Sequence, residues 1–247
     1  MTLERSRLNW NDASDVDPFF AMTGRPMSAW TIEEFLASGD AQVDDVLHKA
    51  AKHGLPETRE SALDFGCGIG RIARGMRRHF RRYVGVDISE GMIKIARRIH
   101  ADLSNCEFMV NTESHLRGFA DNSFDLVYSW GVLQHVPSKA VVKSYVDDFL
   151  RIVKPRGLVV FQLHTDMTLR ARLQPRRRLY NLFRSLGIAA STLVKLKLRP
   201  YDRYYVPEGE VNDWLLRAGS TILERERHDD HAPHKSMTFW VTKSARR

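Results

Sequence analysis

The 247-residue sequence lacks several features that would place it in a specialised class of protein. It has two cysteines, Cys67 and Cys106, which are too few for a disulfide framework or a zinc cluster. No apolar run approaches the ~18 residues that a membrane-spanning helix needs. Residues 1–10 are charged and polar, unlike a secretory signal, and there are no internal repeats. These absences favour a cytoplasmic protein in a reducing compartment.

Acidic residues are scarce in one part of the chain. Residues 164–206 hold ten Lys and Arg but only two acidic residues, Asp166 and Asp202, so this segment has a net charge of +8. The whole chain also has a net charge of +8, so the remainder is neutral. This distribution indicates a basic module inserted into a neutral domain, and it makes a basic nucleic-acid-binding body an unlikely description of the protein.

The length and the apolar content fit one large domain with a full core. At roughly 150 residues per domain, the chain corresponds to one large domain or two small ones. Hydrophobic residues make up 43% of the sequence, which is enough to bury a core and excludes disorder for most of the chain. We expect a single domain with four parts, at residues 1–60, 61–163, 164–206 and 207–247.

Residues 1–60 have a helical pattern and many aromatic side chains. Thr31 and Glu34 have the spacing of a capping box, and apolar residues at helical spacing follow until Gly54. The aromatic residues of this segment are Trp10, Phe19, Phe20 and Trp30. They either anchor the helices on the core or form part of a lid over a site.

From residue 61 the pattern becomes an alternation of strands and helices. Short strands are expected at residues 62–65, 83–86, 108–110, 124–129 and 158–163, with helices between them. Residues 221–227 and 237–241 form two further expected strands after a helix at 207–218. This order predicts an α/β fold, with a seven-stranded, mostly parallel sheet of Rossmann type covered by helices on both faces.

A glycine-rich loop follows the first of these strands. Glycines 66, 68 and 70 open the next helix, and Asp87 ends the second strand 21 residues after Gly66. Glycine lets the backbone approach a ligand, and a carboxylate at the position of Asp87 can accept both hydroxyls of a ribose. The pair therefore predicts a cofactor that contains adenosine.

The spacing of the loop distinguishes between two such cofactors. A dinucleotide loop reads G-x-G-x-x-G, whereas here the third glycine comes one residue early, at Gly70. Asp64 precedes the loop; its negative charge disfavours a pyrophosphate but suits the ammonium group of a methionine moiety. These two observations favour S-adenosylmethionine over a nicotinamide dinucleotide.

At this point the sequence resembles the class I S-adenosylmethionine-dependent methyltransferases, most closely their small-molecule type 11 branch. The resemblance covers residues 61–163 and rests on five blocks in the right order: residues 63–70, 84–89, 121–127, 131–136 and 150–158. The family implies a sheet whose last two strands form an antiparallel hairpin, which the two terminal strands fit.

The resemblance also implies binding roles for particular residues. Asp64 and the backbone of Gly66, Gly68 and Ser129 would hold the methionine end, Asp87 the ribose, and Ile88 and Met92 the adenine. The family usually has an Asp after the third strand to contact the adenine amine. Here the corresponding stretch is Asn111-Thr112-Glu113, so Thr112 is expected at that place, and Glu113 is a further candidate.

His135 is the candidate catalytic residue. It follows the fourth strand, at the carboxyl edge of the sheet where open α/β folds bind ligands. An unperturbed pKa of ~6.5 suits a histidine base near neutral pH. His135 either takes the proton of the acceptor, orients the acceptor, or only packs against the cofactor.

A second group of histidines suggests a metal site, with weaker support. His228, His231 and His234 lie close to Asp229 and Asp230. Because these residues fall in a predicted loop between two strands, where Asp and Pro form turns, we expect no metal.

The basic segment 164–206 contains a helix between Pro175 and Gly187 and is expected to cap the acceptor side. Its arginines either form a solvated face, attract an anionic acceptor, or contact an anionic membrane through Leu179, Leu182, Phe183 and Leu186. The leading hypothesis is methyl transfer to a small molecule, with oxygen slightly favoured as the acceptor atom. The alternatives are an RNA or other nucleic-acid methyltransferase, a nicotinamide-dependent oxidoreductase and a non-catalytic scaffold.

Overall fold

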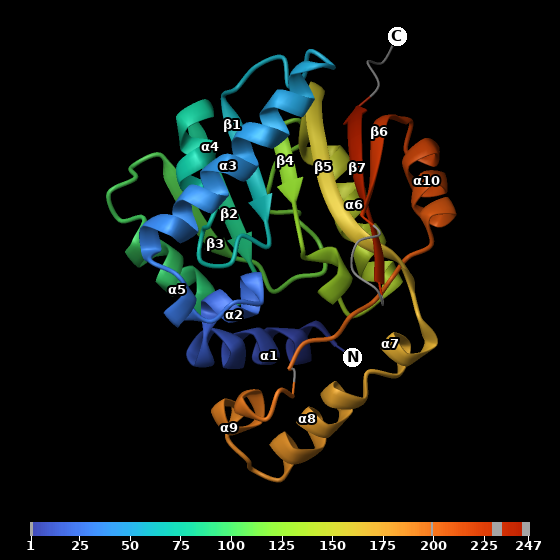
Figure 1. The fold of residues 1–247 in the computed structure, drawn as a ribbon. Coiled ribbons are helices and arrows are strands. Elements are labelled where there is room, and N and C mark those ends of the chain that lie inside the picture. Colours follow the sequence, from blue (N-terminus) through green and yellow to red (C-terminus); the bar gives the residue numbers. More distant parts are fainter. Residues whose placement is uncertain (1, 199, 229–233, 244–247) are drawn as a thin grey trace.

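The computed structural model describes residues 2–198, 200–228 and 234–243. Its centre is a seven-stranded sheet with the strand order β3-β2-β1-β4-β5-β7-β6 (Figure 1). The strands are β1 (Ser61–Phe65), β2 (Arg82–Asp87), β3 (Cys106–Val110), β4 (Phe124–Ser129), β5 (Val153–Met167), β6 (Ser220–His228) and β7 (His234–Lys243). Strands β1 to β5 are parallel, and β7 is antiparallel to both of its neighbours. The predicted fold class is confirmed.

Helices cover both faces of this sheet. The α-helices are α1 (Leu3–Val16), α2 (Pro18–Thr23), α3 (Ile32–Ala51), α4 (Ala73–His79), α5 (Glu90–Ile99), α6 (Lys139–Ile152), α7 (Leu169–Leu173), α8 (Pro175–Ser185), α9 (Ala190–Lys195) and α10 (Glu208–Arg217), with short 3₁₀ helices η1 (Met27–Ala29) and η2 (Leu133–His135). Helices α3, α4 and α5 pack on one face and α6 and α10 on the other. Strand β4 is buried along its whole length, as expected of a central strand covered by helices on both faces.

The local signals at the helix starts are confirmed. The Thr31 hydroxyl accepts a hydrogen bond from the Glu34 backbone N–H, and the Glu34 carboxylate accepts one from the Thr31 N–H, which completes the capping box of α3. Ser138 caps α6 in a similar way, by accepting a hydrogen bond from Val141 N–H. These caps depend only on residues close in sequence, so they could be predicted.

The fifth strand is longer than the sequence suggests. We expected residues 158–163, but β5 extends from Val153 to Met167. Its beginning pairs with Phe124 of β4, and its end pairs with Ser236, Lys235 and His234 of β7. The polar end of β5 was therefore assigned wrongly to the basic insertion, whose first helix is preceded by its cap, Thr168.

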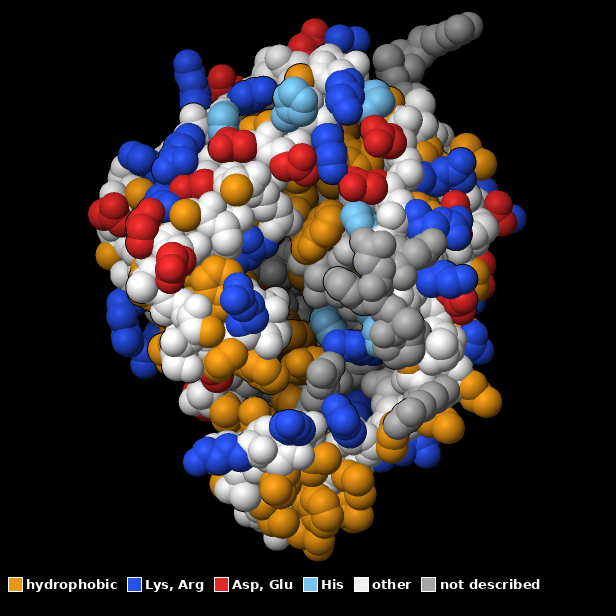
Figure 2. All heavy atoms as spheres, viewed as in Figure 1, with side chains coloured by type: hydrophobic (Ala, Val, Ile, Leu, Met, Phe, Trp, Pro, Cys, Tyr) orange, Lys and Arg blue, Asp and Glu red, His pale blue; other side chains and the backbone are white. Residues whose placement is uncertain are grey.

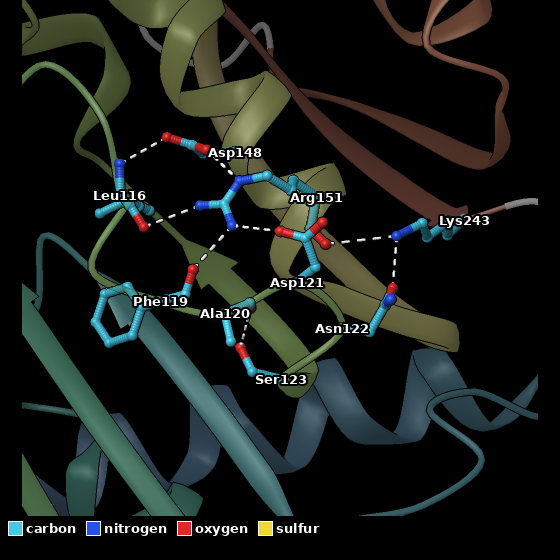
Figure 3. A network of polar contacts seen from close by, with 9 residues as sticks. All are labelled: Leu116, Phe119, Ala120, Asp121, Asn122, Ser123, Asp148, Arg151 and Lys243. Atoms are coloured by element: carbon cyan, nitrogen blue, oxygen red, sulfur yellow. Dashed lines mark hydrogen bonds and ion pairs between the residues drawn. The ribbon is translucent and has the colours of Figure 1, made fainter.

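Arg151 at the end of α6 holds the loop that leads into β4 (Figure 3). Its guanidinium donates to the carbonyl oxygens of Leu116 and Phe119 and to the carboxylates of Asp121 and Asp148, at 2.7–3.0 Å. The other oxygen of Asp148 accepts a hydrogen bond from Leu116 N–H at 2.6 Å. One arginine thus satisfies several polar groups and fixes the entry to the central strand.

The N-terminal helices and the basic insertion lie at the carboxyl end of the parallel strands (Figure 1). Helices α1 and α2 cross the tips of the strands, and α7, α8 and α9 project beyond them. None of the helices in the described ranges is both long and apolar enough to cross a membrane. This arrangement encloses the end of the sheet where parallel α/β proteins bind ligands.

Candidate active site

A cavity of about 560 Å³ lies at the carboxyl end of the sheet. Loops that follow β1, β2 and β4 form one side of it, and α1, α2 and the segment that leaves the insertion form the other. Of the residues predicted for the site, those that line the cavity are Gly66, Gly68, Asp87, Ile88, Met92 and His135. The fold therefore brings together residues from three separate loops.

The glycine loop has a backbone that only glycine fits well. Gly66 and Gly68 have φ angles of +80° and +55°, in the left-handed region. A Cβ atom on Gly66 would lie 2.2 Å from a methyl group of Val132, and one on Gly68 would lie 2.6 Å from the sulfur of Met22. The loop is thus closely covered by the chain after β4 and by α2.

Gly70 has a different role from the other two glycines. It also has a positive φ, of +81°, but a Cβ there would lie 2.7 Å from the imidazole Nε2 of His100. Gly70 does not line the cavity, so it serves the packing of the loop against the body of the protein.

Asp87 connects the glycine loop to the end of β2. One carboxylate oxygen accepts a hydrogen bond from Gly68 N–H and the other from Ser89 N–H, each at 2.9 Å. Burial raises the pKa of Asp87 above its usual value, while these backbone donors oppose the shift. The carboxylate is therefore oriented by the backbone at the edge of the cavity.

Asp64 is buried and lies outside the cavity lining. Its side chain is 5% exposed and accepts a hydrogen bond from the Tyr83 hydroxyl at 2.8 Å. Burial raises its pKa to about 7, against the opposing effects of that hydrogen bond and of the positive charge of Arg71. Arg71, unlike Asp64, lines the cavity.

The residues expected beside the adenine are placed differently from one another. Ile88 and Met92 line the cavity, whereas Thr112 and Glu113 are exposed and do not. Their neighbour Asn111 lines it instead, and its side-chain amide donates to the Glu113 and His115 carbonyl oxygens at 3.2 and 3.3 Å. A loop sequence does not specify which of these neighbouring residues turns toward the cavity.

Ser129, at the end of β4, is fully buried and does not line the cavity through its side chain. Within the described part of the chain, its hydroxyl oxygen has no hydrogen-bond partner. Trp130 and Gly131, which follow it, line the cavity. The predicted contact of Ser129 with a cofactor concerns its backbone.

His135 lies in η2, immediately after the loop that follows β4. Its Nδ1 is 2.5 Å from the Asp202 carbonyl oxygen. Because a carbonyl oxygen can only accept, Nδ1 carries the proton and Nε2 is the basic nitrogen of the neutral ring. The ring lies edge-on to Trp10 and Tyr201, with centroids 5.4 and 5.2 Å away.

The chain that leaves the basic insertion is fixed over η2. Tyr204 N–H donates to the Gln134 carbonyl oxygen at 2.7 Å, and Asp202 forms a buried ion pair with Arg177 of α8. Burial raises the pKa of Asp202 to about 6, while Arg177 opposes this shift. The insertion thus positions His135 through backbone contacts.

Three residues that line the cavity near His135 were not among the predicted site residues. Tyr201 stacks on Trp10 at a centroid distance of 5.3 Å, and Arg203 and Gln162 also line the cavity. For Trp10, the sequence offered one signal that it could belong to the site, which was the abundance of aromatic side chains in residues 1–60. The aromatic residues divide between the two predicted roles, since Trp10 and Phe20 line the cavity while Phe19 and Trp30 pack on Phe35.

The second group of histidines is only partly described. His228 lies 2.8 Å from the Thr238 hydroxyl, and His234 stacks on His164 and contacts Arg203. Burial, with the nearby positive groups, lowers the pKa of His164 to about 3. His231, Asp229 and Asp230 lie outside the described residues; among those described, no three His, Cys, Asp or Glu side chains could hold a metal ion.

Methyltransferases are among the known proteins that share this sequence pattern and fold. The family model for the "Methyltransferase domain" matches residues 63–161. A ubiquinone biosynthesis O-methyltransferase from Neisseria meningitidis is 30% identical over 186 residues, which are 72% of this chain and 67% of that protein. The chain belongs to the class I S-adenosylmethionine-dependent methyltransferases.

Two further similarities agree with this assignment. A 2-methyl-6-phytyl-1,4-hydroquinone methyltransferase from Synechocystis is 34% identical over 120 residues, 47% of this chain and 36% of that protein. The crystal structure of magnesium protoporphyrin IX methyltransferase from Synechocystis, with bound SAH, superimposes with a TM-score of 0.62 at 17% identity. The superposition covers 98% of this chain and 99% of the other, so the two proteins share the whole fold.

S-adenosylmethionine is therefore the cofactor of this methyltransferase, and the cavity fits it. The glycine loop provides a backbone cradle in which a side chain at Gly66 or Gly68 would collide with its neighbours. The carboxylate of Asp87 lies at the cavity edge, where a ribose needs an acceptor for its hydroxyls. The prediction of this cofactor over a nicotinamide dinucleotide is confirmed.

Proposed function

We propose that this methyltransferase methylates a hydroxyl group of a small molecule, with His135 as the base. The observation that carries the proposal is that His135 lines the same cavity as the glycine loop and Asp87. The names of the relatives support a small-molecule acceptor, and that of the Neisseria relative supports oxygen as the methylated atom.

The proposed cofactor roles rest on the cavity lining for most of these residues, and on the family resemblance for Ser129 and Asp64. Gly66 and Gly68 hold the methionine end through their backbone, together with the Ser129 backbone and the buried charge of Asp64. Asp87 holds the ribose, and Ile88 and Met92 flank the adenine. Asn111 takes the place beside the adenine amine that we expected of Thr112, because Asn111 reaches the cavity.

The bound cofactor supplies a methyl group on a positively charged sulfur. The protein needs to align the acceptor hydroxyl with that methyl group and to remove its proton. Nε2 of His135 takes the proton as the new oxygen–carbon bond forms and the sulfur–carbon bond breaks, which leaves a methyl ether and a neutral thioether. Trp10 and Tyr201 fix the imidazole plane and exclude water from this step.

The charge of the acceptor side favours an acidic acceptor. Arg203 lines the cavity, and its backbone is held by Gln174, whose side chain exchanges two hydrogen bonds with it at 2.7 and 3.0 Å. A guanidinium at this place can pair with a carboxylate or phosphate on the acceptor.

The acceptor can be sought with isotope-labelled cofactor. A metabolite extract is incubated with the protein and methyl-labelled S-adenosylmethionine, and labelled products are identified by mass spectrometry and NMR. We expect a labelled methyl ether with the wild type and none with Asp87→Ala. A product methylated only on nitrogen or carbon would contradict the proposal.

The role of His135 is tested with that acceptor. Because general-base catalysis contributes ~10²- to 10⁴-fold, His135→Ala should lower kcat by at least a hundredfold while binding of S-adenosylhomocysteine is unchanged. His48→Ala, which changes an exposed histidine on α3, is the matched control and should keep full activity. An unchanged kcat/KM for His135→Ala would remove His135 from catalysis.

A further inference from the structure

Helix α8 packs on the protein with its charged side and exposes its apolar side. Arg177 pairs with the buried Asp202, Arg184 pairs with Asp12 of α1, and Tyr180 between them is fully buried. These three residues form one face of the helix, at spacings of three and four. The leucines at positions 179, 182 and 186 therefore point away from the protein.

The exposed leucines continue over the neighbouring helices. Leu182 is 55% exposed, Leu186 70%, Leu169 74% and Leu196 64%. Figure 2 shows hydrophobic side chains gathered at the base of the molecule, where Figure 1 places α8 and α9. We call this surface the leucine face, and it consists of Leu169, Leu173, Leu179, Leu182, Leu186, Ile188 and Leu196.

The chain that carries the leucine face has charge of one sign. Residues 167–201 contain nine Lys and Arg and no Asp or Glu. Arg176, Arg178, Lys195 and Lys197 are exposed. Basic side chains therefore flank the apolar surface, as Figure 2 also shows beside the group at the base.

We propose that the leucine face docks this methyltransferase onto a membrane surface that contains anionic lipid. Exposed aliphatic side chains with flanking Lys and Arg are the pattern of helices that lie in the membrane interface. Protein interfaces instead favour aromatic residues and are depleted in lysine, and leucine is uncommon among their energetic centres. The face also projects from the core, so it can meet a flat bilayer.

A groove lies between α2 and the basic residues that flank the leucine face. Val194, Leu198 and Phe20 line a groove of about 580 Å³ whose basic residues are Arg176, Lys195 and Lys197. A small cavity between α2 and α9 shares Phe20 with this groove, and it shares Phe20, Ala21 and Tyr201 with the active-site cavity. The groove beside the leucine face and the active-site cavity are therefore neighbours, with Phe20 in the lining of both.

Co-sedimentation with vesicles tests the docking. The wild type should bind vesicles of phosphatidylcholine mixed with phosphatidylglycerol, bind phosphatidylcholine alone poorly, and lose binding at high salt. Leu182→Asp with Leu186→Asp should lower the partition coefficient at least tenfold. Arg176→Gln with Arg178→Gln should lower it about thirtyfold on the anionic vesicles only, at ~1 kcal/mol for each lost charge.

Two matched variants control for general effects of these substitutions. Leu216 is 63% exposed on α10, away from the leucine face, so Leu216→Asp should bind vesicles like the wild type. Arg81 has an 80% exposed side chain, and Arg81→Gln should also bind normally. Each variant should bind S-adenosylhomocysteine like the wild type, which shows that it is folded and separates docking from the chemistry at His135.

Two results would overturn the proposal. One is a wild type that does not bind anionic vesicles, or a Leu182→Asp, Leu186→Asp variant that binds them equally well. The other is a concentration-dependent dimer, seen by sedimentation velocity, that the same pair of substitutions breaks without any vesicle binding; the leucine face would then meet a second copy of the chain.

Discussion

Asp64→Asn should make the protein more stable and its cofactor binding weaker. Asp64 is buried, with the Tyr83 hydroxyl as its hydrogen-bond donor, and its pKa is raised from 3.8 to about 7. A carboxylate in that place is suited to an ammonium group, which the protein without cofactor does not supply. Asparagine has nearly the same shape, can still accept from Tyr83, and has no charge to bury.

The size and pH dependence of the effect follow from that pKa. A rise of about 3 pKa units, at ~1.4 kcal/mol each, corresponds to a penalty of about 4 kcal/mol for the ionised carboxylate. Because the folded-state pKa is above the unfolded-state value, the penalty is absent below pH 4, grows between pH 4 and 7, and is complete above pH 7. A neutral amide is a weaker acceptor by about 1 kcal/mol, so the net gain at pH 8 should be about 2–4 kcal/mol.

Urea unfolding of both proteins without cofactor, at pH 8 and at pH 4.5, measures this gain. The variant should be more stable at pH 8, and the difference should fall toward zero at pH 4.5. Calorimetry should show S-adenosylhomocysteine bound about 10- to 100-fold more weakly by the variant, since the neutral amide removes the buried negative charge that, in its proposed role, attracts the ammonium group of the cofactor. A variant less stable at both pH values, or with unchanged affinity, would refute the reasoning.

Two further substitutions test the loop and the scaffold. Gly66→Ala should abolish cofactor binding and destabilise the fold by about 2 kcal/mol or more, because it combines a φ of +80° with a contact of 2.2 Å to Val132. Gly118→Ala, which meets nothing within 4 Å, is its control and should change neither property in calorimetry or urea unfolding. Arg151→Ala should lower the free energy of unfolding by about 3 kcal/mol, since it leaves Asp148 and two loop carbonyls without their donor. Arg81→Ala, at an exposed site, should cost less than about 0.5 kcal/mol, and equal effects of the two arginine variants would contradict the described network.

The cofactor half of the site could be predicted because its signals are local. The glycine loop and Asp87 are separated by one helix, and strand ends in a parallel sheet meet at one edge. The choice among Asn111, Thr112 and Glu113 could not be made from the sequence, because a loop gives no periodicity that fixes which residue turns inward. The fold class was predictable for a similar reason, since the alternation of strands and helices favours a parallel sheet covered by helices.

The acceptor half depends on contacts between distant segments. Trp10 and Tyr201 are 191 positions apart, and their stacking follows from how α1 meets the chain after α9. The leucine stripe of α8 has the spacing of a buried face, yet it is exposed because Asp12 and Asp202 bind the arginines on the opposite side. Both acids lie outside the sequence of α8. The apolar spacing that predicted the helix therefore could not show which side of it faces the core.

Calorimetry of S-adenosylhomocysteine and NADH with the wild type and Asp87→Ala tests the central claim most directly. The account predicts that the wild type binds S-adenosylhomocysteine and does not bind NADH. It also predicts that Asp87→Ala binds S-adenosylhomocysteine at least a hundredfold more weakly, because the ribose hydroxyls lose their charged acceptor. Tight binding of NADH without binding of S-adenosylhomocysteine, or equal affinity in the variant, would contradict the account.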